Sequence, residues 1–385
     1  MKLDMSTRNK VIEKKRIQYQ KSTKKEKGKI LDSLCLSTEL SRDRLKKILS
    51  ENYVKTKHTN KKSGRKRKYG PRIISALDEL WPLLDYSSGK RFCAGLDDML
   101  DAIERFDSDL FNQETKRLLR SISPATVERI LKGKREKLTL KGKSTTKPGT
   151  LLKKDIPIRL GTEWDENKVG FLEIDLVAHC GSTVAGEYVN TLDVTDIFSG
   201  WTETRAIINK AQKHTFQALK TIEDKLPFTI LGLDSDNGSE FINDQLYRYC
   251  KEKDIMFTRG RPFMKNDGCH IEQKNWHIVR RSIGYARYEG QPAVNIMNKY
   301  YDLLRLYSNF FLTHMKLISK TRNESKIKKK YDYPKTPYRR ILEDPSIPKD
   351  QKDKLISISL SLNPIKINND MQRLLEALYK LHISD

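Results

Sequence analysis

Three carboxylates in this sequence stand where they could carry out chemistry. Asp175 ends one apolar, strand-like stretch, Asp236 ends another, and Glu272 lies one turn into a helix that follows "FMKNDGCH". A carboxylate at the end of an apolar strand is costly unless it is paired, hydrogen-bonded or bound to a cation. Three converging carboxylates favour a divalent cation, and oxygen-only ligands suit Mg²⁺ or Mn²⁺ rather than zinc.

Such a site supports displacement at phosphorus. Two Mg²⁺ ions would be held by Asp175, Asp236 and Glu272, and they would supply activation of water or a 3′-hydroxyl and stabilisation of the leaving oxygen in an in-line displacement. Two further carboxylates leave the ligand set open, because Asp234 and Glu173 each lie two residues before a candidate and share its strand face. We interpret Glu173 as a structural or supporting charge and keep Asp234 as a rival ligand.

These carboxylates fall in a segment, 166–290, in which strand and helix patterns alternate. Strands are expected within 169–179, within 188–207 as strand, turn and strand, within 228–236 and at 255–259. Helices are expected at 213–226, at 240–253 and from about 266. Three leading strands followed by alternating helices and strands predict a mixed five-stranded sheet flanked by helices.

The stretch "LGLDSDNGSEFIND" (231–244) shows how a strand delivers Asp236 to the end of the sheet. Asn237 and Gly238 supply a tight turn that tolerates positive φ, and Ser239 is placed to cap the next helix. Asn237 and His270 are expected to support the carboxylates by hydrogen bonding. Trp276, four residues after Glu272, is expected to pack on the same helix face.

On the stretches "LEIDLV", "DSDNGSEF" and "CHIEQKN", the chain resembles the catalytic core of DDE transposases and retroviral integrases, which is ribonuclease H-like, over about 165–290. More loosely, "ILDSLCLSTELSRDRLKKIL", "RKRKYGP", "SPATVERIL" and the tail from "LLRLYSNFF" to "KTPYRRIL" look like bacterial insertion-sequence transposases. The resemblance implies that Asp175, Asp236 and Glu272 catalyse DNA cleavage at the ends of an element and strand transfer to target DNA. It also implies a homo-oligomer on DNA, and it favours Asp236 over Asp234.

The resemblance departs from retroviral integrases at the N-terminus, where a pair of histidines with a CxxC motif is absent. Helical DNA-binding units are expected in its place. The formal net charge is +25, and residues 1–72 contain 24 basic and 7 acidic side chains, so a polyanionic partner is expected. Apolar spacing from Gly28 predicts two short helices, a helix-turn-helix pattern whose second helix presents Arg42, Arg44, Lys46 and Lys47 to a major groove.

The predicted organisation is multidomain, with all-α units before an α/β core and a helical C-terminal region. The boundaries are a helix-turn-helix at 1–60, a basic linker at 61–72, a second helical DNA-binding unit at 73–136, a linker at 137–165, the core at 166–290 and a basic helical region at 291–385. In the second unit, Ser123 is placed as N-cap and Gly133 as the stop of a helix. Further DNA contacts are expected from Arg65, Arg67, Arg129, Lys132, Lys265, Lys274, Arg280 and Arg281, each of which could also be a plain solvated charge.

Several classes are disfavoured. The five cysteines include no CxxC pair, so neither a disulfide framework nor a zinc finger is expected, and the chain carries no apolar run long enough for a membrane span and no signal-peptide pattern. No small-molecule cofactor is expected, and the location implied is the bacterial cytoplasm, at the nucleoid. Two rivals remain open: a DNA-binding regulator derived from a transposase, and a structure-selective nuclease of the same fold.

Overall fold

The structure is a computed structural model that describes residues 5–50, 68–107, 109–138, 168–236, 238, 240–260, 271, 274–323 and 326–383. The chain divides into two compact units, Met1–Lys68 and Tyr69–Asp385. Within the described residues, none of the helices combines the length and the apolar character that crossing a bilayer requires.

The first unit is a small helical bundle of α1 (Met5–Lys21), α2 (Lys24–Thr38) and α3 (Arg42–Leu49). Its buried cluster consists of Ile12, Leu31, Leu34, Leu45 and Leu49. The two helices expected from Gly28 onward correspond to α2 and α3, and Ser41 caps α3 by accepting a hydrogen bond from the Arg44 amide. The helix α1 was not expected, because the sequence from residue 1 to residue 28 is almost entirely polar and basic. Ile12 is the side chain of α1 in the buried cluster. DNA contact through α3 stays a prediction.

The second unit begins with four helices: α4 (Pro71–Leu83), α5 (Gly89–Phe106), α6 (Gln113–Arg120) and α7 (Pro124–Arg135), followed by the turn η1 (Glu136–Leu138). The Ser123 cap is confirmed, since its hydroxyl accepts from the Thr126 amide. Gly133 does not end α7, which continues to Arg135. The apolar faces of these helices share one buried cluster with the sheet and the C-terminal helices.

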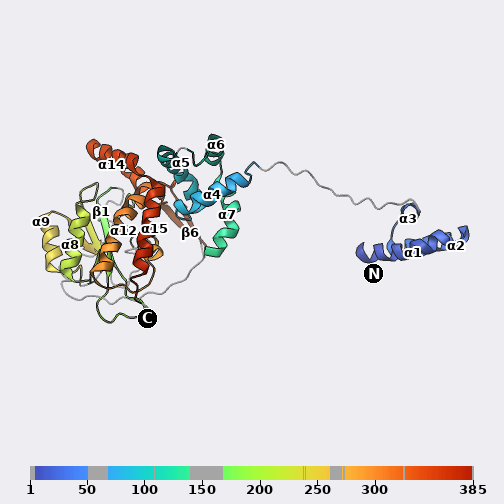
Figure 1. Cartoon of the computed structure of the whole chain (residues 1–385), viewed down its shortest axis with the longest axis horizontal. Coiled ribbons are helices and arrows are strands. Elements are labelled where there is room, and N and C mark those ends of the chain that lie inside the picture. The colour runs from blue at the N-terminus through green and yellow to red at the C-terminus, as the bar shows by residue number, and fades with distance from the viewer. Residues whose placement is uncertain are drawn as a thin grey trace. The chain divides into compact units, whose positions relative to one another are not determined.

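The core is a five-stranded sheet in the order β3-β2-β1-β4-β5. Its strands are β1 (Phe171–Ala178), β2 (Asn190–Asp196), β3 (Thr202–Ile207), β4 (Gly232–Ser235) and β5 (Met256–Arg259). Figure 1 shows the strand β1 beside the helices α8 (Gln212–Glu223) and α9 (Asp244–Glu252). The first three strands are antiparallel, whereas β4 and β5 run parallel to β1. This confirms the mixed five-stranded sheet, and its order and directions are consistent with a ribonuclease H-like core.

The two faces of the sheet differ in chemistry. One face presents Ile174, Leu192 and Leu233 to α8 (Gln212–Glu223) and α9 (Asp244–Glu252), and this is an apolar cluster. The other face carries polar side chains, and η2 (Asn275–Arg280) packs against β1 while α12 (Gly290–Phe311) packs against β3. The short α11 (Arg281–Ile283) continues η2. Because side chains alternate between faces, Asp175 and its cross-strand neighbour Asp193 point to the polar face.

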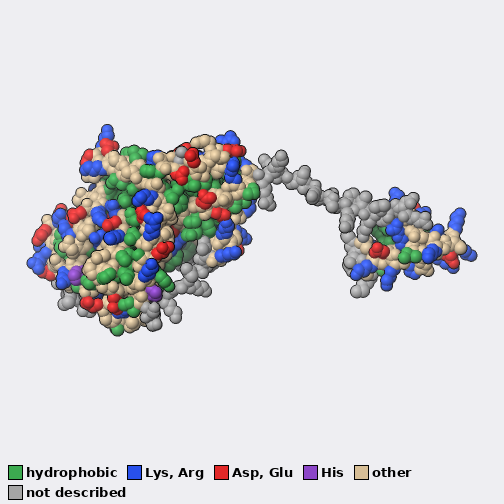
Figure 2. All heavy atoms as spheres, in the orientation of Figure 1, with side chains coloured by type: hydrophobic (Ala, Val, Ile, Leu, Met, Phe, Trp, Pro, Cys, Tyr) green, Lys and Arg blue, Asp and Glu red, His purple; other side chains and the backbone are tan. Residues whose placement is uncertain are grey.

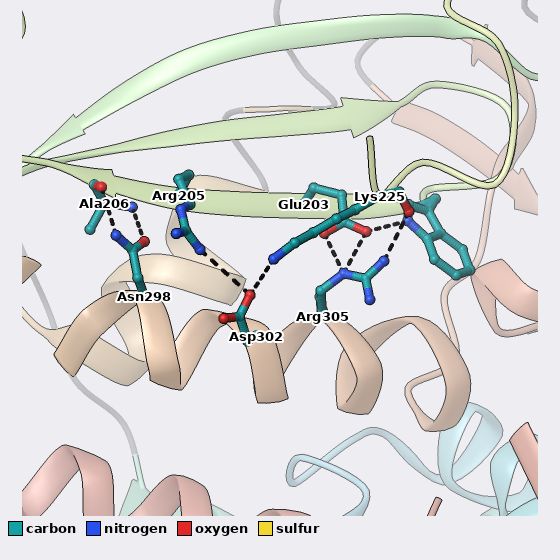
Figure 3. Close-up of polar contacts among 8 residues, drawn as sticks. Glu203, Arg205, Ala206, Lys225, Asn298, Asp302 and Arg305 are labelled. Atoms are coloured by element: carbon teal, nitrogen blue, oxygen red, sulfur yellow. Dashed lines mark hydrogen bonds and ion pairs between the residues drawn. The ribbon is translucent and has the colours of Figure 1, made fainter. Parts of the chain in front are cut away.

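The helix α12 closes the free edge of the sheet at β3. The Asn298 side chain forms two hydrogen bonds with the Ala206 backbone, at 2.8 Å and 3.0 Å, and Asn309 does the same with the Thr202 backbone at 3.0 Å and 2.9 Å. Between them, Arg305 pairs with the buried Glu203 at 2.6 Å (Figure 3). These side chains occupy donors and acceptors that an edge strand otherwise leaves open to other chains.

The C-terminal region is not wholly helical as expected. After α12 the chain forms a two-stranded antiparallel sheet of β6 (Leu317–Asn323) and β7 (Lys326–Tyr331), where only a basic run was recognised. The helices α13 (Pro337–Glu343), α14 (Lys349–Ser361) and α15 (Pro364–Tyr379) follow. The predicted last helix, about 370–382, is the C-terminal part of α15, whose N-cap is Asn363.

His179 makes the core sensitive to acid. Its side chain is fully buried and shares a 2.8 Å hydrogen bond with the Thr191 hydroxyl, and burial lowers the pKa of His179 to about 3. Below pH 6.5, His179 is therefore protonated in the unfolded chain but stays neutral in the folded chain until the pH approaches 3. The contribution of this group to the free energy of unfolding is fully present above pH 6.5 and is lost as the pH falls towards 3. Between pH 7 and pH 4.5 we expect the wild type to lose about 2 to 3 kcal/mol more than His179→Gln. Urea unfolding at both pH values measures this, and parallel losses in the two proteins would contradict it.

Candidate active site

Asp175 and Asp236 come together on the polar face of the sheet. β1 and β4 are parallel with Ile174 opposite Ser235, so the next pair in this register is Asp175 and Asp236. Burial, followed by the charge of Asp236, raises the pKa of Asp175 to about 7. The pKa of Asp236 is raised as well, by burial, against the Gly238 amide and the charge of Lys210. The raised pKa values show that two negative charges are unfavourable at this place. A bound cation would offset these charges, so the pair is suited to cation binding.

The turn after Asp236 is built differently from the prediction. The Gly238 amide donates to Asp236 Oδ1 at 2.8 Å. Gly238 does not have the expected positive φ, and an added Cβ would lie 2.7 Å from Glu240 Cδ and 2.8 Å from Asp236 Oδ1, so a larger residue would displace these two carboxylates. The following helix starts only at Asp244, with Asn243 as the cap, so the expected start near Glu240 is corrected.

Glu240 joins the acidic group at this site, and sequence reasoning missed it. Its charge helps to raise the pKa of Asp175, and its carboxylate lies beside Gly238. Glu240 is part of the "DNGSEF" stretch, so the sequence contained a sign of its role. The expectation that a helix starts at Glu240 hid this role, because a helical residue there would not be expected to face Asp175.

The segment on either side of position 272 is tied to β1. On one side, the Ile271 amide donates to Glu173 Oε2 at 2.9 Å. On the other, Asn275 Nδ2 donates to Asp175 Oδ2 at 2.6 Å. Glu272 itself lies outside the described residues, and so do Asn237, Ser239, Lys265 and His270. The buried Glu173 therefore has the structural role expected of it, and Asn275 is a site residue that the sequence did not reveal.

Asn275 is expected to position the Asp175 carboxylate. The described residues contain a π-helical turn from Asn275 to Arg280, a form of helix often found at functional sites. We expect Asn275→Ala to lower the rate of any Mg²⁺-dependent reaction at this site about 10- to 100-fold, as for other residues that orient metal ligands. The midpoint of thermal unfolding should change little. The Mg²⁺ dependence of the rate measures the effect. Asn275→Asp, which cannot donate at high pH, should be at least as damaging, and an active Asn275→Asp protein would contradict the assignment.

Asp234 is already engaged within the core. It is buried, and its Oδ1 accepts a 2.6 Å hydrogen bond from the Thr258 hydroxyl on β5. This contact weakens the case for Asp234 as the rival ligand. Asp236, by contrast, reaches solvent at the end of the strand, although the protein packed around its carboxylate is dense enough to raise its pKa.

Lys274 corrects one expectation about DNA contacts. Its ammonium is buried, donates to the Gly200 carbonyl at 2.8 Å and lies 3.4 Å from His314 Nε2, so it is not presented to phosphate. Burial lowers the pKa of Lys274 to about 7, against the charge of Asp193. Asp193 is fully buried opposite Asp175, and neither carboxylate oxygen has a hydrogen-bond partner among the described residues.

The other candidates on this segment lie nearer the surface. Arg281 pairs with Asp85 at 2.8 Å and joins the core to the helices before it. Arg280 is half-buried and lies over the Tyr285 ring at 4.8 Å.

Trp276 is 53% exposed, so the expectation that it packs is wrong. The π-helical turn that contains Trp276 does not keep the residue spacing of an α-helix.

The remaining DNA candidates that the structure describes are exposed, and their contact with DNA stays a prediction. In α3, Arg42 pairs with Asp32 and Lys46 with Asp43, while Arg44 and Lys47 are exposed. In α7, Arg129 and Lys132 are exposed. Arg65 and Arg67 lie outside the described residues. Lysine and arginine side chains are spread over the visible surface of each unit among acidic ones (Figure 2).

The donor set fits a hard divalent cation. Asp175 and Asp236 offer only oxygen ligands, their like charges repel one another, and Glu240 adds negative charge nearby. Among the residues that the structure describes, no group of three or more metal-binding side chains is assembled, and the third predicted ligand, Glu272, is outside that set.

No protein-family model matches the chain. The structure shows similarity to the HTLV-2 integrase catalytic core domain in complex with magnesium, in its trimeric form (17% identity, TM-score 0.25, 29% of this chain and 68% of that chain) and its dimeric form (14%, 0.28, 37% and 88%). It is also similar to the BIV integrase catalytic core domain (16%, 0.27, 36% and 83%). These TM-scores are low, so the description of the core rests on its own strand order and register.

A relative covers nearly the whole chain. The sequence is 31% identical over 341 residues to "Uncharacterized protein y4rM" of Sinorhizobium fredii (strain NBRC 101917 / NGR234), and the match spans 88% of this chain and 96% of the relative. At this identity and coverage, the chain belongs to the same protein family as y4rM.

Proposed function

We propose that this protein is a DNA strand transferase of the DDE type, which cleaves DNA strands and joins 3′-hydroxyl ends to target DNA with divalent metal. The observation that carries the proposal is the convergence on β1. Asp175 meets Asp236 across parallel strands, and the residues flanking Glu272 are hydrogen-bonded to Glu173 and Asp175 of the same strand.

Asp175, Asp236 and Glu272 would hold two Mg²⁺ ions, or Mn²⁺ in their place. The ions would supply Lewis-acid stabilisation of charge at phosphorus. The chain's own contribution is to hold the carboxylates, through Asn275 on Asp175 and the Gly238 amide on Asp236. A positively charged chain favours DNA as the polyanion, and a multimer on DNA, with contacts to the ends of a mobile element, is part of the proposal.

Strand transfer is the test. Purified full-length protein is incubated with Mg²⁺, labelled DNA that carries the ends of the element, and supercoiled target plasmid. Joined products that require Mg²⁺ or Mn²⁺ would support the proposal. Cutting without joining would favour the nuclease, and tight end binding with neither reaction would favour the regulator.

A further inference from the structure

The two-stranded sheet formed by β6 and β7, here called the β6–β7 ribbon, is exposed on both faces. Every side chain that the structure describes in its two strands is exposed. The exposed fractions of its large apolar side chains are 48% for Leu317, 59% for Ile318, 51% for Ile327 and 44% for Tyr331. A two-stranded ribbon is marginally stable on its own, and clustered exposed apolar side chains mark interaction sites. The exposed apolar side chains therefore mark the ribbon as an interaction surface.

The charge of the ribbon indicates a polyanion. Lys328, Lys329 and Lys330 are consecutive and exposed, and among the described residues none of them forms an ion pair. The acid that follows the ribbon, Asp332, is used at its base, where it pairs with Arg340 at 2.7 Å and accepts the Lys316 amide at 2.6 Å. The three lysines are therefore available to an anionic partner.

The register separates two kinds of side chain. Lys328 is opposite Thr321 and Lys330 is opposite Ser319, so one face pairs lysines with small hydroxyl side chains. Ile327, Lys329 and Tyr331 alternate onto the other face. Lysine and hydroxyl side chains are typical phosphate contacts, and the major groove of duplex DNA, about 12 Å wide, admits a two-stranded ribbon. Pairing of the ribbon edge with a second copy is disfavoured, because lysines on an edge strand oppose it.

The base of the ribbon is fixed next to the catalytic segment. His314 and Lys335 exchange backbone hydrogen bonds of 2.9 Å and 3.1 Å at the start of the ribbon. The His314 ring lies 3.4 Å from Lys274 Nζ, and the neighbouring Asn275 holds Asp175. Thr313 is also bound to Arg91 of α5 through the Arg91 Nε donor at 2.6 Å. A duplex held by the ribbon would therefore be anchored to the segment that carries the catalytic groups.

We propose that the β6–β7 ribbon is a DNA-binding arm that lies in a groove of duplex DNA, with Lys328 and Lys330 on the phosphates. The inference rests on the proposed function, since DNA is the substrate there, and it adds a site of non-specific contact. Its role is distinct from catalysis, because no side chain of the ribbon is among the groups that shift the pKa of Asp175 or Asp236.

The test is the salt dependence of DNA binding by the full-length protein. The variant replaces Lys328, Lys329 and Lys330 with alanine, and the matched control replaces Lys349, Lys352 and Lys354 of α14. A labelled 30-base-pair duplex of arbitrary sequence is titrated without Mg²⁺ at 50 to 200 mM KCl, with fluorescence anisotropy as the readout. Each phosphate contact contributes about 0.9 to the slope of log affinity against log salt.

We expect the slope of the ribbon variant to be shallower by about 1.8, the share of the two phosphate contacts of Lys328 and Lys330, so that its affinity falls about 12-fold less than that of the wild type across this range. The α14 control should keep the wild-type slope, as should the variant with three arginines in place of the lysines. An unchanged slope in the ribbon variant, with wild-type strand transfer intact, would overturn the inference and leave the proposed function standing.

Two further outcomes are decisive. If light scattering shows that the ribbon variant loses its multimer while its slope is unchanged, the ribbon is a contact between copies and the inference is wrong. If the wild type binds no duplex even at 50 mM salt, the inference and the proposed function fall together. Equal thermal midpoints of the variants exclude misfolding, since all three side chains are exposed.

Discussion

Replacing Asp236 with asparagine is expected to lower Mg²⁺-dependent cleavage and joining of DNA by at least about a thousandfold. Asparagine keeps the shape and can still accept the Gly238 amide, so the turn should survive. What is lost is the negative charge that faces Asp175 at the end of the sheet. Gel analysis of labelled DNA measures the rate, and anisotropy checks that DNA binding is retained.

The matched control is Asp234→Asn, two residues earlier on the same strand. Asparagine can still accept the Thr258 hydroxyl, so the internal contact is kept. We expect activity within about tenfold of the wild type, because no ligand charge is lost. Should Asp234→Asn be inactive and Asp236→Asn active, the ligand would be Asp234, and the assignment from the D-N-G-x-E-F motif would be wrong.

Replacing Arg305 with leucine is expected to destabilise the protein by about 3 to 5 kcal/mol. Arg305 Nε donates to both oxygens of Glu203, at 2.9 Å and 2.6 Å, and its guanidinium also donates to the Lys225 carbonyl at 3.0 Å (Figure 3). The Glu203 side chain is only 2% exposed, so without Arg305 it is a buried, uncompensated charge. Urea unfolding followed by circular dichroism at pH 7 gives the free energy of unfolding.

The double variant Arg305→Leu with Glu203→Gln separates the buried charge from lost packing. Glutamine can still accept the Trp201 indole N–H, which donates to Glu203 at 2.8 Å. We expect the double variant to recover to within about 2 kcal/mol of the wild type, because no charge is then left unpaired. A double variant as unstable as Arg305→Leu would show that packing and the Lys225 contact account for the loss.

Much of the core could be predicted from the sequence, because its strands are apolar runs bounded by turn residues and its helices have a clear apolar period. Elements whose stability comes from elsewhere were missed. The helix α1 is mostly polar or charged, and the β6–β7 ribbon has a lysine run where an apolar alternation would be expected. The pairing of Asn298 with the β3 backbone also gives no local signal, since the partners are 92 residues apart.

The candidate site shows the same division. Asp236 could be placed because it follows the end of the apolar strand β4, next to the parallel strand β1, whereas Asp175 was expected at a strand end and lies within β1, three residues before Ala178. Asn275 could not be placed, since its contact with Asp175 depends on a π-helical turn that breaks the usual spacing. The misassigned Lys274 makes a related point: a lysine in a basic segment is interpreted as surface charge, although long-range packing buries this one against Gly200.

The closure of β3 by α12 has a consequence for the order in which the protein is made. During synthesis, Ala206 leaves the ribosome 92 residues before the Asn298 that completes its hydrogen bonds. At usual translation rates the edge of the sheet stays open for roughly 5 to 20 seconds. During that interval the backbone groups of β3 are open to pairing with other chains, and they are closed only when α12 has been made.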